Sequence, residues 1–303
     1  MPNRPAVLAG AWYPGDTEEL RLLVDGLLAK ARGRAAAMPP PPGGRHAAAP
    51  LPRAVIVPHA GLAYSGPTAA LAYARLAAAW EAAGHEADCL YLFGAAHQGT
   101  AGGPEVWPEG RWETPLGDLE VDSGAARLLA DEGLARPGTR PHGRDNALEL
   151  QLPFVARLFP AARIVPVAVP PDGQAEPLGR AAWIQATRLG RRVIAVGSTD
   201  LTHYGAAFGV MPAGRGPGAV AWTRANSKPF LGALETMDWP AALAAARRDG
   251  SACGAGAAVA AGAFAQAAGA TRGTLLEHAT SAEITGETAS AEHLVGYAAM
   301  IYG

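Results

Sequence analysis

The spacing of apolar residues along the chain predicts alternating strands and helices. Short, nearly continuous apolar runs are typical of buried strands, and they occur at 53–57, 89–94, 163–169 and 192–197. Apolar residues recur at helical spacing over 16–32, 67–84, 123–132, 147–158 and 177–190. A last apolar run at 294–301 is consistent with a closing strand. This order favours an α/β fold, with a mixed or largely parallel sheet covered by helices on both faces.

Two segments depart from this alternation. Residues 33–52 are rich in Pro, Ala and Gly, which predicts a loop within the fold, and no domain boundary is evident after it. We therefore expect residues 1–303 to form a single domain. Residues 252–271 carry no charge and could span a bilayer by length alone. Because Ala and Gly dominate this stretch, we interpret it as a buried, closely packed helix.

Composition excludes several classes of protein. The chain has 303 residues, 49% hydrophobic and 17% charged, so it can bury a substantial core and is not disordered. Its formal net charge of -2 gives no reason to expect nucleic acid or a membrane surface as a partner. Its two cysteines, Cys89 and Cys253, form no disulfide framework. With no signal peptide evident at the N-terminus, we expect a cytoplasmic protein.

Histidines follow three of the predicted strands. His59 follows the strand at 53–57, His97 ends "LYLFGAAH", and His203 ends "VIAVGSTDLTH", each with a glycine nearby. Open α/β sheets bind ligands beyond the carboxyl ends of their strands, so these histidines are candidates for one site. The remaining candidates share none of this context, and we expect them at the surface: His46, His85, His278 and His293.

Cys253 is the candidate thiol. It stands where the Ala/Gly-rich helix should begin, and a helix N-terminus stabilises a thiolate, whereas Cys89 inside its strand is interpreted as a small buried residue. Two imidazoles and a thiolate would make a three-ligand site for Fe, Cu or Zn. Alternatively Cys253 is a metal-free nucleophile, with His203 as its base and Asp200 as the orienting carboxylate. Spacing alone leaves both readings open.

Several motifs resemble those of a known family. "RPAVLAGAWYPGD", "PHAGLAYSG", "GAAH", "TPLGDLEVD", "ALELQLPF", "STDLTHYG", "CGAG" and "LVGYAAMIY" occur in the order seen in the MEMO family, whose bacterial members are called AmmeMemoRadiSam system protein B. The resemblance covers almost the whole chain. It implies a single-domain α/β fold similar to class III (LigB-type) extradiol dioxygenases.

The resemblance also implies residue roles. His59, His97 and Cys253 match the family's ligands for a redox-active metal, iron or copper. Asp200 and His203 match the residues that complete the pocket, where we expect acid–base roles. Within the same motifs, further candidates for lining the pocket are Tyr64, Ser65, Asn146, Glu149 and Tyr204.

The sequence departs from the family at two places. Asn146-Ala147 stands where the family often has His-Ser, so an amide and a methyl group replace a candidate acid–base or substrate contact. The turn Gly94-Ala95-Ala96-His97 lacks the usual hydroxyl. Both departures weaken any substrate assignment by analogy.

The leading hypothesis is a mononuclear metal protein with redox or oxygen chemistry, acting on a small-molecule substrate. One alternative is a non-catalytic adaptor that binds a peptide or copper in the same pocket. Others are the metal-free cysteine nucleophile and a true extradiol-type ring-cleaving dioxygenase. The sequence identifies neither the substrate nor the metal, and it leaves a homo-oligomer open.

Overall fold

The computed structural model describes residues 3–38, 51–100, 102–138 and 145–303. The helices are α1 (Thr17–Ala36), α2 (Leu62–Ala82), α3 (Ser123–Asp131), α4 (Asn146–Glu149), α5 (Leu152–Leu158), α6 (Ala175–Arg188), α7 (Pro217–Glu235), α8 (Trp239–Asp249), α9 (Ala255–Ala267) and α10 (Ser281–Thr285), with a 3₁₀ turn at Ala206–Phe208. The strands are β1 (Ala54–Val57), β2 (Cys89–Ala95), β3 (Glu105–Val106), β4 (Arg111–Trp112), β5 (Leu119–Glu120), β6 (Arg136–Pro137), β7 (Arg163–Val169), β8 (Val193–Ser198), β9 (His203–Tyr204), β10 (Gly273–Thr280) and β11 (Leu294–Tyr302).

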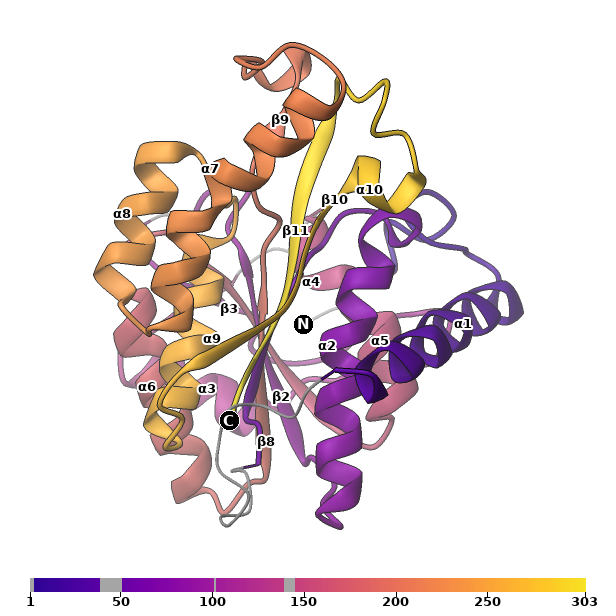
Figure 1. Ribbon diagram of the computed structural model, residues 1–303. Coiled ribbons are helices and arrows are strands. Elements are labelled where there is room, and N and C mark those ends of the chain that lie inside the picture. The colour runs from indigo at the N-terminus through magenta and orange to yellow at the C-terminus, as the bar shows by residue number, and fades with distance from the viewer. Residues whose placement is uncertain (1–2, 39–50, 101, 139–144) are drawn as a thin grey trace.

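One mixed sheet organises the fold (Figure 1). Its strand order is β10-β11-β1-β8-β2-β7-β3-β6, with β9 paired to β11. The four central strands β1, β8, β2 and β7 run parallel, whereas β11 and β3 flank them in the antiparallel direction. The predicted single-domain α/β fold with a mixed sheet is therefore confirmed, and it is consistent with a LigB-like fold.

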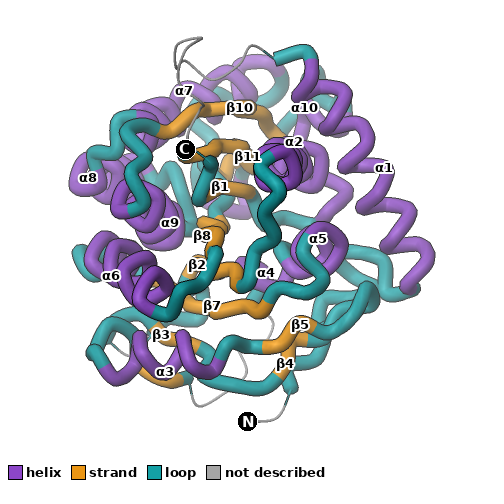
Figure 2. Tube along the Cα trace, turned by 90° about the horizontal axis from the view of Figure 1, so that it is seen from below, coloured by secondary structure: helices purple, strands orange, loops and turns teal. Residues whose placement is uncertain are grey.

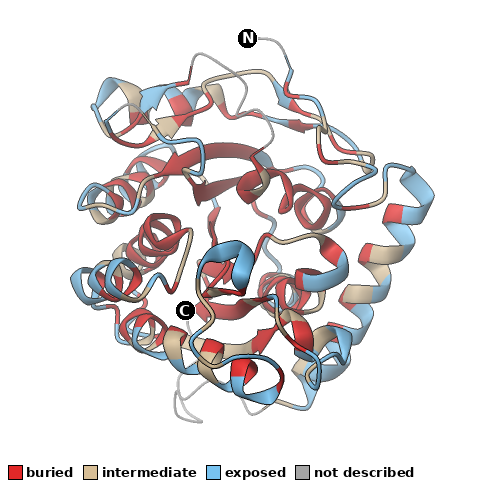
Figure 3. Ribbon diagram, turned by 90° about the horizontal axis from the view of Figure 1, so that it is seen from above, coloured by how far each residue is buried: buried red, intermediate tan, exposed pale blue. Residues whose placement is uncertain are grey.

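Helices cover both faces of this sheet (Figure 2). On one face α9 packs against β8, β2 and β1, with α6 and α8 outside it. On the other, α2 packs against β1 and β11, with α1 outside it. Buried residues concentrate in the central strands and the inner helices, while α1 exposes one face (Figure 3). The core thus forms two layers, one on each side of the parallel strands.

The interpretation of the Ala/Gly-rich stretch is confirmed. Every residue from Ala255 to Ala265 in α9 is buried. A Cβ atom on Gly256 would lie 2.1 Å from the carbonyl oxygen of Pro170, and one on Gly179 of α6 would lie 2.0 Å from that of Ala260. Only small residues permit such close packing of backbones. Among the helices described, none is both long and apolar enough to cross a membrane.

Three predicted boundaries were wrong. Helix α1 continues to Ala36, into the segment predicted as a loop from residue 33, because Arg and Ala favour helix and offset Gly33; residues 39–50 of that segment lie outside the described residues. Helix α2 begins at Leu62 and includes Pro67, which costs one backbone hydrogen bond without ending the helix. The single helix predicted over 147–158 is instead two helices, and Pro153 stands in the first turn of the second, which begins at Leu152.

The histidines that we expected at the surface differ in their exposure. His85 and His293 are exposed, as predicted, and His46 lies outside the described residues. His278 was placed wrongly, because it lies half-buried on β10. Burial, reinforced by the positive charge of Arg224, lowers the pKa of His278 to about 4. Strand β10 has no regular alternation of apolar residues, so the sequence did not predict it.

Candidate metal centre

Three neighbouring parallel strands deliver the predicted site to one edge of the sheet. His59 follows β1, His97 follows β2, and Asp200 follows β8, which lies between them. Cys253 arrives from the turn before α9 and is held there by its backbone N–H, which donates to the carbonyl of Asp200 at 3.2 Å. The expected convergence beyond the carboxyl ends of the strands is therefore what the structure shows.

His59, His97 and Cys253 form a compact cluster of donor atoms. One ligand atom from each residue lies within 4.8 Å of the others. Cys253 Sγ is 3.2 Å from His59 Nε2, and the two imidazole rings are 5.1 Å apart at 82°. His59 is buried, Cys253 is partly buried and His97 is exposed. The cluster can therefore be reached from solvent on the His97 side.

A hydrogen-bond network fixes the tautomer of His59. Ser198 Oγ lies 3.0 Å from His59 Nδ1 and donates its own proton to the carbonyl of Ala147. It also accepts a hydrogen bond from Gln151 Nε2 at 2.9 Å. Because the single hydroxyl proton is committed to Ala147, Ser198 must accept from His59, so Nδ1 carries the proton. The lone pair of Nε2 is then directed at Cys253.

The start of α4 supports both histidines. Asp145 Oδ2 lies 3.8 Å from His97 Nδ1, and the side-chain amide of Asn146 donates to the carbonyl of His59 at 2.9 Å. Ala147 supplies the carbonyl that accepts from Ser198. Carboxylates and carbonyls beside ligating histidines orient the rings and raise their basicity. Residues 145–147 thus contact His97 directly, the backbone of His59, and Ser198 beside the His59 ring.

Asp200 is bonded to the backbone of His59. Its Oδ1 accepts the backbone N–H of His59 at 2.7 Å, and in the described part of the chain no hydrogen bond joins it to His203. Burial raises the pKa of Asp200 to about 6, although the hydrogen bond from His59 opposes this. His203 is half-buried on β9, with its ring 5.0 Å from that of Phe208. Asp200 therefore holds the main chain of His59 in place, and His203 packs against Phe208.

Burial favours the neutral forms of His59 and Cys253. It lowers the pKa of His59 well below its usual range, and the nearby His97 and His203 act in the same direction. Burial also raises the pKa of the Cys253 thiol, with a further increase from Asp200. The thiolate stabilisation expected from the helix N-terminus is thus outweighed. A bound cation would reverse this balance, because a thiol that coordinates a metal is deprotonated.

Three predicted pocket residues support the site from inside the protein. Ser65 is buried and donates to the carbonyl of Ala60 at 2.6 Å. Glu149 is fully buried and binds Arg4 at 2.6 Å. Tyr204 is buried, with its hydroxyl bonded to Ala213 and Gly214. Tyr64 lines the pocket described next.

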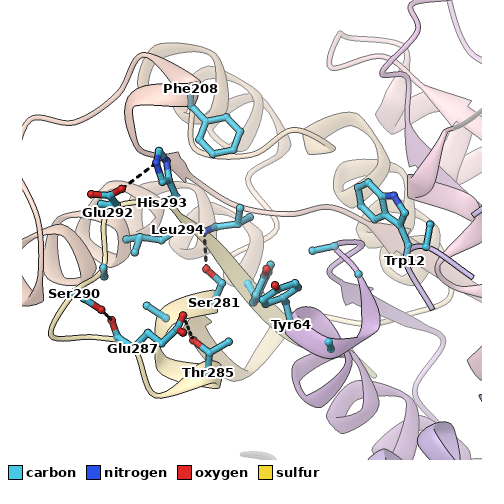
Figure 4. Close-up of a pocket in the computed structure, with 18 residues that line it drawn as sticks. Trp12, Tyr64, Phe208, Ser281, Thr285, Glu287, Ser290, Glu292, His293 and Leu294 are labelled. Atoms are coloured by element: carbon cyan, nitrogen blue, oxygen red, sulfur yellow. Dashed lines mark hydrogen bonds and ion pairs between the residues drawn. The ribbon is translucent and has the colours of Figure 1, made fainter. Parts of the chain in front are cut away.

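A pocket of about 650 Å³ lies near the cluster, although His59, His97 and Cys253 do not line it (Figure 4). Its wall includes Ala60 and Gly61, which directly follow His59. Sequence reasoning missed most of its lining, since the residues come from distant segments: Trp12, Phe208, Ser281, Thr285, Glu287, Glu292, His293, Val295 and Tyr297. The available signals were the quoted motifs, since Trp12 lies in "RPAVLAGAWYPGD" and Val295 and Tyr297 lie in "LVGYAAMIY".

The donor set fits a metal ion. Two imidazoles and one thiol offer ligand atoms that lie within 4.8 Å of one another, and a hydrogen-bond network leaves the lone pair of His59 Nε2 free. Nitrogen and sulfur donors suit Fe, Cu and Zn. The group could therefore hold an ion whose identity the geometry does not specify.

Comparison with known proteins agrees with the motifs. Residues 4–301 match the model of the family described as Memo-like protein. A MEMO1 family protein of Thermococcus onnurineus is 32% identical over 315 residues, covering 100% of this chain and 99% of the relative. One of Methanopyrus kandleri is 30% identical with the same coverage, and one of Aeropyrum pernix is 34% identical over 67% of this chain and 71% of its own length. The chain therefore belongs to the Memo-like protein family.

Proposed function

We propose that this protein holds a single redox-active metal ion through His59, His97 and Cys253. The observation that carries this proposal is the convergence of three donor atoms within 4.8 Å at the edge of the sheet. Iron(II) or copper fits the proposal best, because thiolate favours softer ions than a carboxylate does, and zinc is a further candidate. When bound, the ion would supply redox or oxygen chemistry near this pocket.

The chain's own residues would position the reacting molecule and move protons. Asp200 holds the backbone of His59 in place. His203 is the candidate acid–base group, because imidazole is the side chain that most often transfers protons in catalysis. Asn146 cannot do so, because an amide does not titrate, and its side chain is already bonded to the carbonyl of His59. We therefore favour metal-dependent oxidoreduction in a reducing compartment such as the cytoplasm over extradiol ring cleavage.

A second candidate is a protein that binds the metal without turnover. The structural role of Asn146 favours it, because a family position that could carry an acid–base group here only supports a ligand. The metal-free nucleophile has less support. Burial raises the pKa of the Cys253 thiol, and the sulfur faces His59 instead of His203.

Elemental analysis tests the proposal. We would purify the wild type, His97→Ala, Cys253→Ala and the surface control His85→Ala without added metal, and then load each with Fe(II) or Cu. We expect about one ion per chain in the wild type and the control, and loss of the ion in both ligand variants. A wild type that takes up no ion would overturn the metal proposal. Oxygen uptake by the loaded protein over a panel of reductants then separates an enzyme from a metal-binding adaptor.

A further inference from the structure

Three exposed aromatic side chains gather around the pocket beside the metal cluster. Trp12, Tyr64 and Phe208 are 41%, 50% and 45% exposed, and all three line it. The other large hydrophobic residues with comparable exposure in the described ranges are aliphatic: Leu22, Ile184 and Leu189. Large apolar side chains that share one exposed surface usually mark a binding site. The aromatic residues come from three separate segments, so chance proximity along the chain does not explain them.

Immediate neighbours of the cluster and of His203 line the pocket, although these histidines and Cys253 do not line it themselves. Ala60 and Gly61 line it directly after His59, and Val295 lines it while pairing with His203 across the β9–β11 ladder. The Phe208 ring meets the His203 ring at 5.0 Å. A molecule in this pocket would therefore lie near His203 and near the candidate metal ligands.

The acidic side chains on the pocket wall favour a positively charged ligand over a negatively charged one. The charged side chains that line it are Glu287, Glu292 and His293, and neither Lys nor Arg lines it. Glu292 is paired with Arg215 at 2.8 Å and lies 3.5 Å from His293. Glu287 accepts from the Thr285 hydroxyl at 3.1 Å, and within the described residues it has no ion-pair partner. An anion would meet unneutralised negative charge here, whereas a cation would find a free carboxylate.

The two kinds of lining lie on different sides. In Figure 4 the acidic side chains of the segment from Ser281 to His293 lie opposite Trp12, with Tyr64 between them and Phe208 above. Trp12 and Tyr64 thus form an aromatic end of the pocket and the carboxylates form an acidic end, with Phe208 above the space between them. A ligand that matches both ends has a flat apolar body and a positively charged end.

We propose that this pocket binds a small aromatic amine, with its ring against Trp12, Tyr64 and Phe208 and its ammonium group at Glu287. The inference rests on the proposed function, since it names the class of molecule held beside the metal cluster. Ring stacking and cation–π attraction supply affinity at the aromatic end. The free carboxylate supplies discrimination between charges.

A matched series of probes tests the proposal on the full-length protein. 2-(1-Naphthyl)ethylamine, 2-(1-naphthyl)ethanol and 1-naphthylacetate share an aromatic body and differ in charge. We would measure each dissociation constant by equilibrium dialysis at pH 7. We expect the amine to bind about tenfold more tightly than the alcohol, and the carboxylate most weakly. Equal or tighter binding of the carboxylate, or no saturable binding of the amine, would overturn the proposal.

Variants locate the binding site. We expect Glu287→Gln to remove the preference for the amine over the alcohol while leaving alcohol binding unchanged. Glu81→Gln is the matched control, because it lies at the opposite end of α2 from Tyr64. Phe208→Ala should weaken all three probes about tenfold, whereas Leu189→Ala, equally exposed on another surface, should not. Identical behaviour of the Glu287 and Glu81 variants would place the amine elsewhere and refute the assignment.

Metal content separates this inference from the proposed function. Dialysis would be repeated on chelator-treated protein and on protein loaded with Fe(II) or Cu, with elemental analysis of the same samples. Amine preference without metal uptake would refute the metal proposal alone. Metal uptake without amine preference would refute the ligand class alone.

Discussion

Ser198 Oγ lies 3.0 Å from His59 Nδ1 and can only accept from it, since the serine proton is given to Ala147. The hydroxyl therefore keeps the proton on Nδ1 and leaves a lone pair on Nε2, the nitrogen that faces Cys253. Ser198 would not itself ligate an ion, but it determines which nitrogen of His59 can do so.

Replacing Ser198 with Ala should weaken metal binding. His59 would lose the acceptor that keeps Nδ1 protonated, and loss of such a partner typically costs ~10–100-fold in metal affinity. Competition with a coloured chelator would measure the change in dissociation constant. Ser290→Ala, on the exposed rim of the pocket, is the control and should leave the affinity unchanged. An unchanged affinity in the Ser198 variant would show that the tautomer is fixed in another way.

Replacing Glu149 with Gln should destabilise the fold strongly. Arg4 and Glu149 are 1% and 0% exposed, and the same carboxylate accepts from Leu8 and Tyr13. Removing one partner of a buried ion pair costs ~3–5 kcal/mol of unfolding free energy. Urea unfolding would measure the loss against Glu176→Gln, which breaks a surface pair with Arg180 and should cost under ~1 kcal/mol. Similar losses in the two variants would contradict this account.

Replacing His203 with Gln should leave metal content near that of the wild type. His203 lies outside the group of converging donor atoms and stands beside the pocket. Any turnover found should fall by ~10²–10⁴-fold, which is the usual contribution of general acid–base catalysis. Metal analysis and oxygen uptake on the same sample would give both values. A metal loss as large as that of His97→Ala would instead identify His203 as a ligand.

Stability should depend on pH through His278. Its pKa is lowered to about 4 in the folded protein, so the unfolded chain binds more protons between pH 6.5 and 4. The contribution is complete above pH 6.5 and is lost as the pH falls toward 4. We expect about 1–2 kcal/mol of unfolding free energy, allowing for solvent screening at this partly exposed group.

Urea unfolding between pH 4 and 7 would measure this dependence. His278→Gln should flatten the curve in that window, while His85→Gln, which changes an exposed histidine, should follow the wild type. Parallel curves for the wild type and His278→Gln would show that other groups control the acid response.

The elements that sequence reasoning predicted well are the buried parallel strands. Strand β7 has the predicted bounds, because a fully buried strand is a continuous apolar run. Helix α7 was not predicted, since Pro217 begins it, Pro229 lies within it and polar residues interrupt its pattern. Strand β10 lies at the edge of the sheet, where partial burial leaves no clear period.

The site was predictable to the extent that topology determines it. Residues that follow parallel strands of one sheet lie at the same edge, and this brought His59 after β1 and His97 after β2 to the same end of β8. The buried ion pair of Glu149 could not be predicted from the sequence, because its partner Arg4 lies 145 residues away and no local pattern links them. Phe208 was missed for a related reason: an exposed aromatic residue in a loop has no period that marks it as lining a pocket.

The turn that begins α4 has a mechanical consequence for the site. Asp145 faces His97, Asn146 donates a hydrogen bond to the backbone of His59, and the carbonyl of Ala147 accepts one from Ser198. The separation and orientation of the two imidazoles are therefore coupled to three consecutive residues that offer no ligand atom to the metal. Any movement of this turn would displace both rings together, which makes it a single point from which the coordination geometry can be altered.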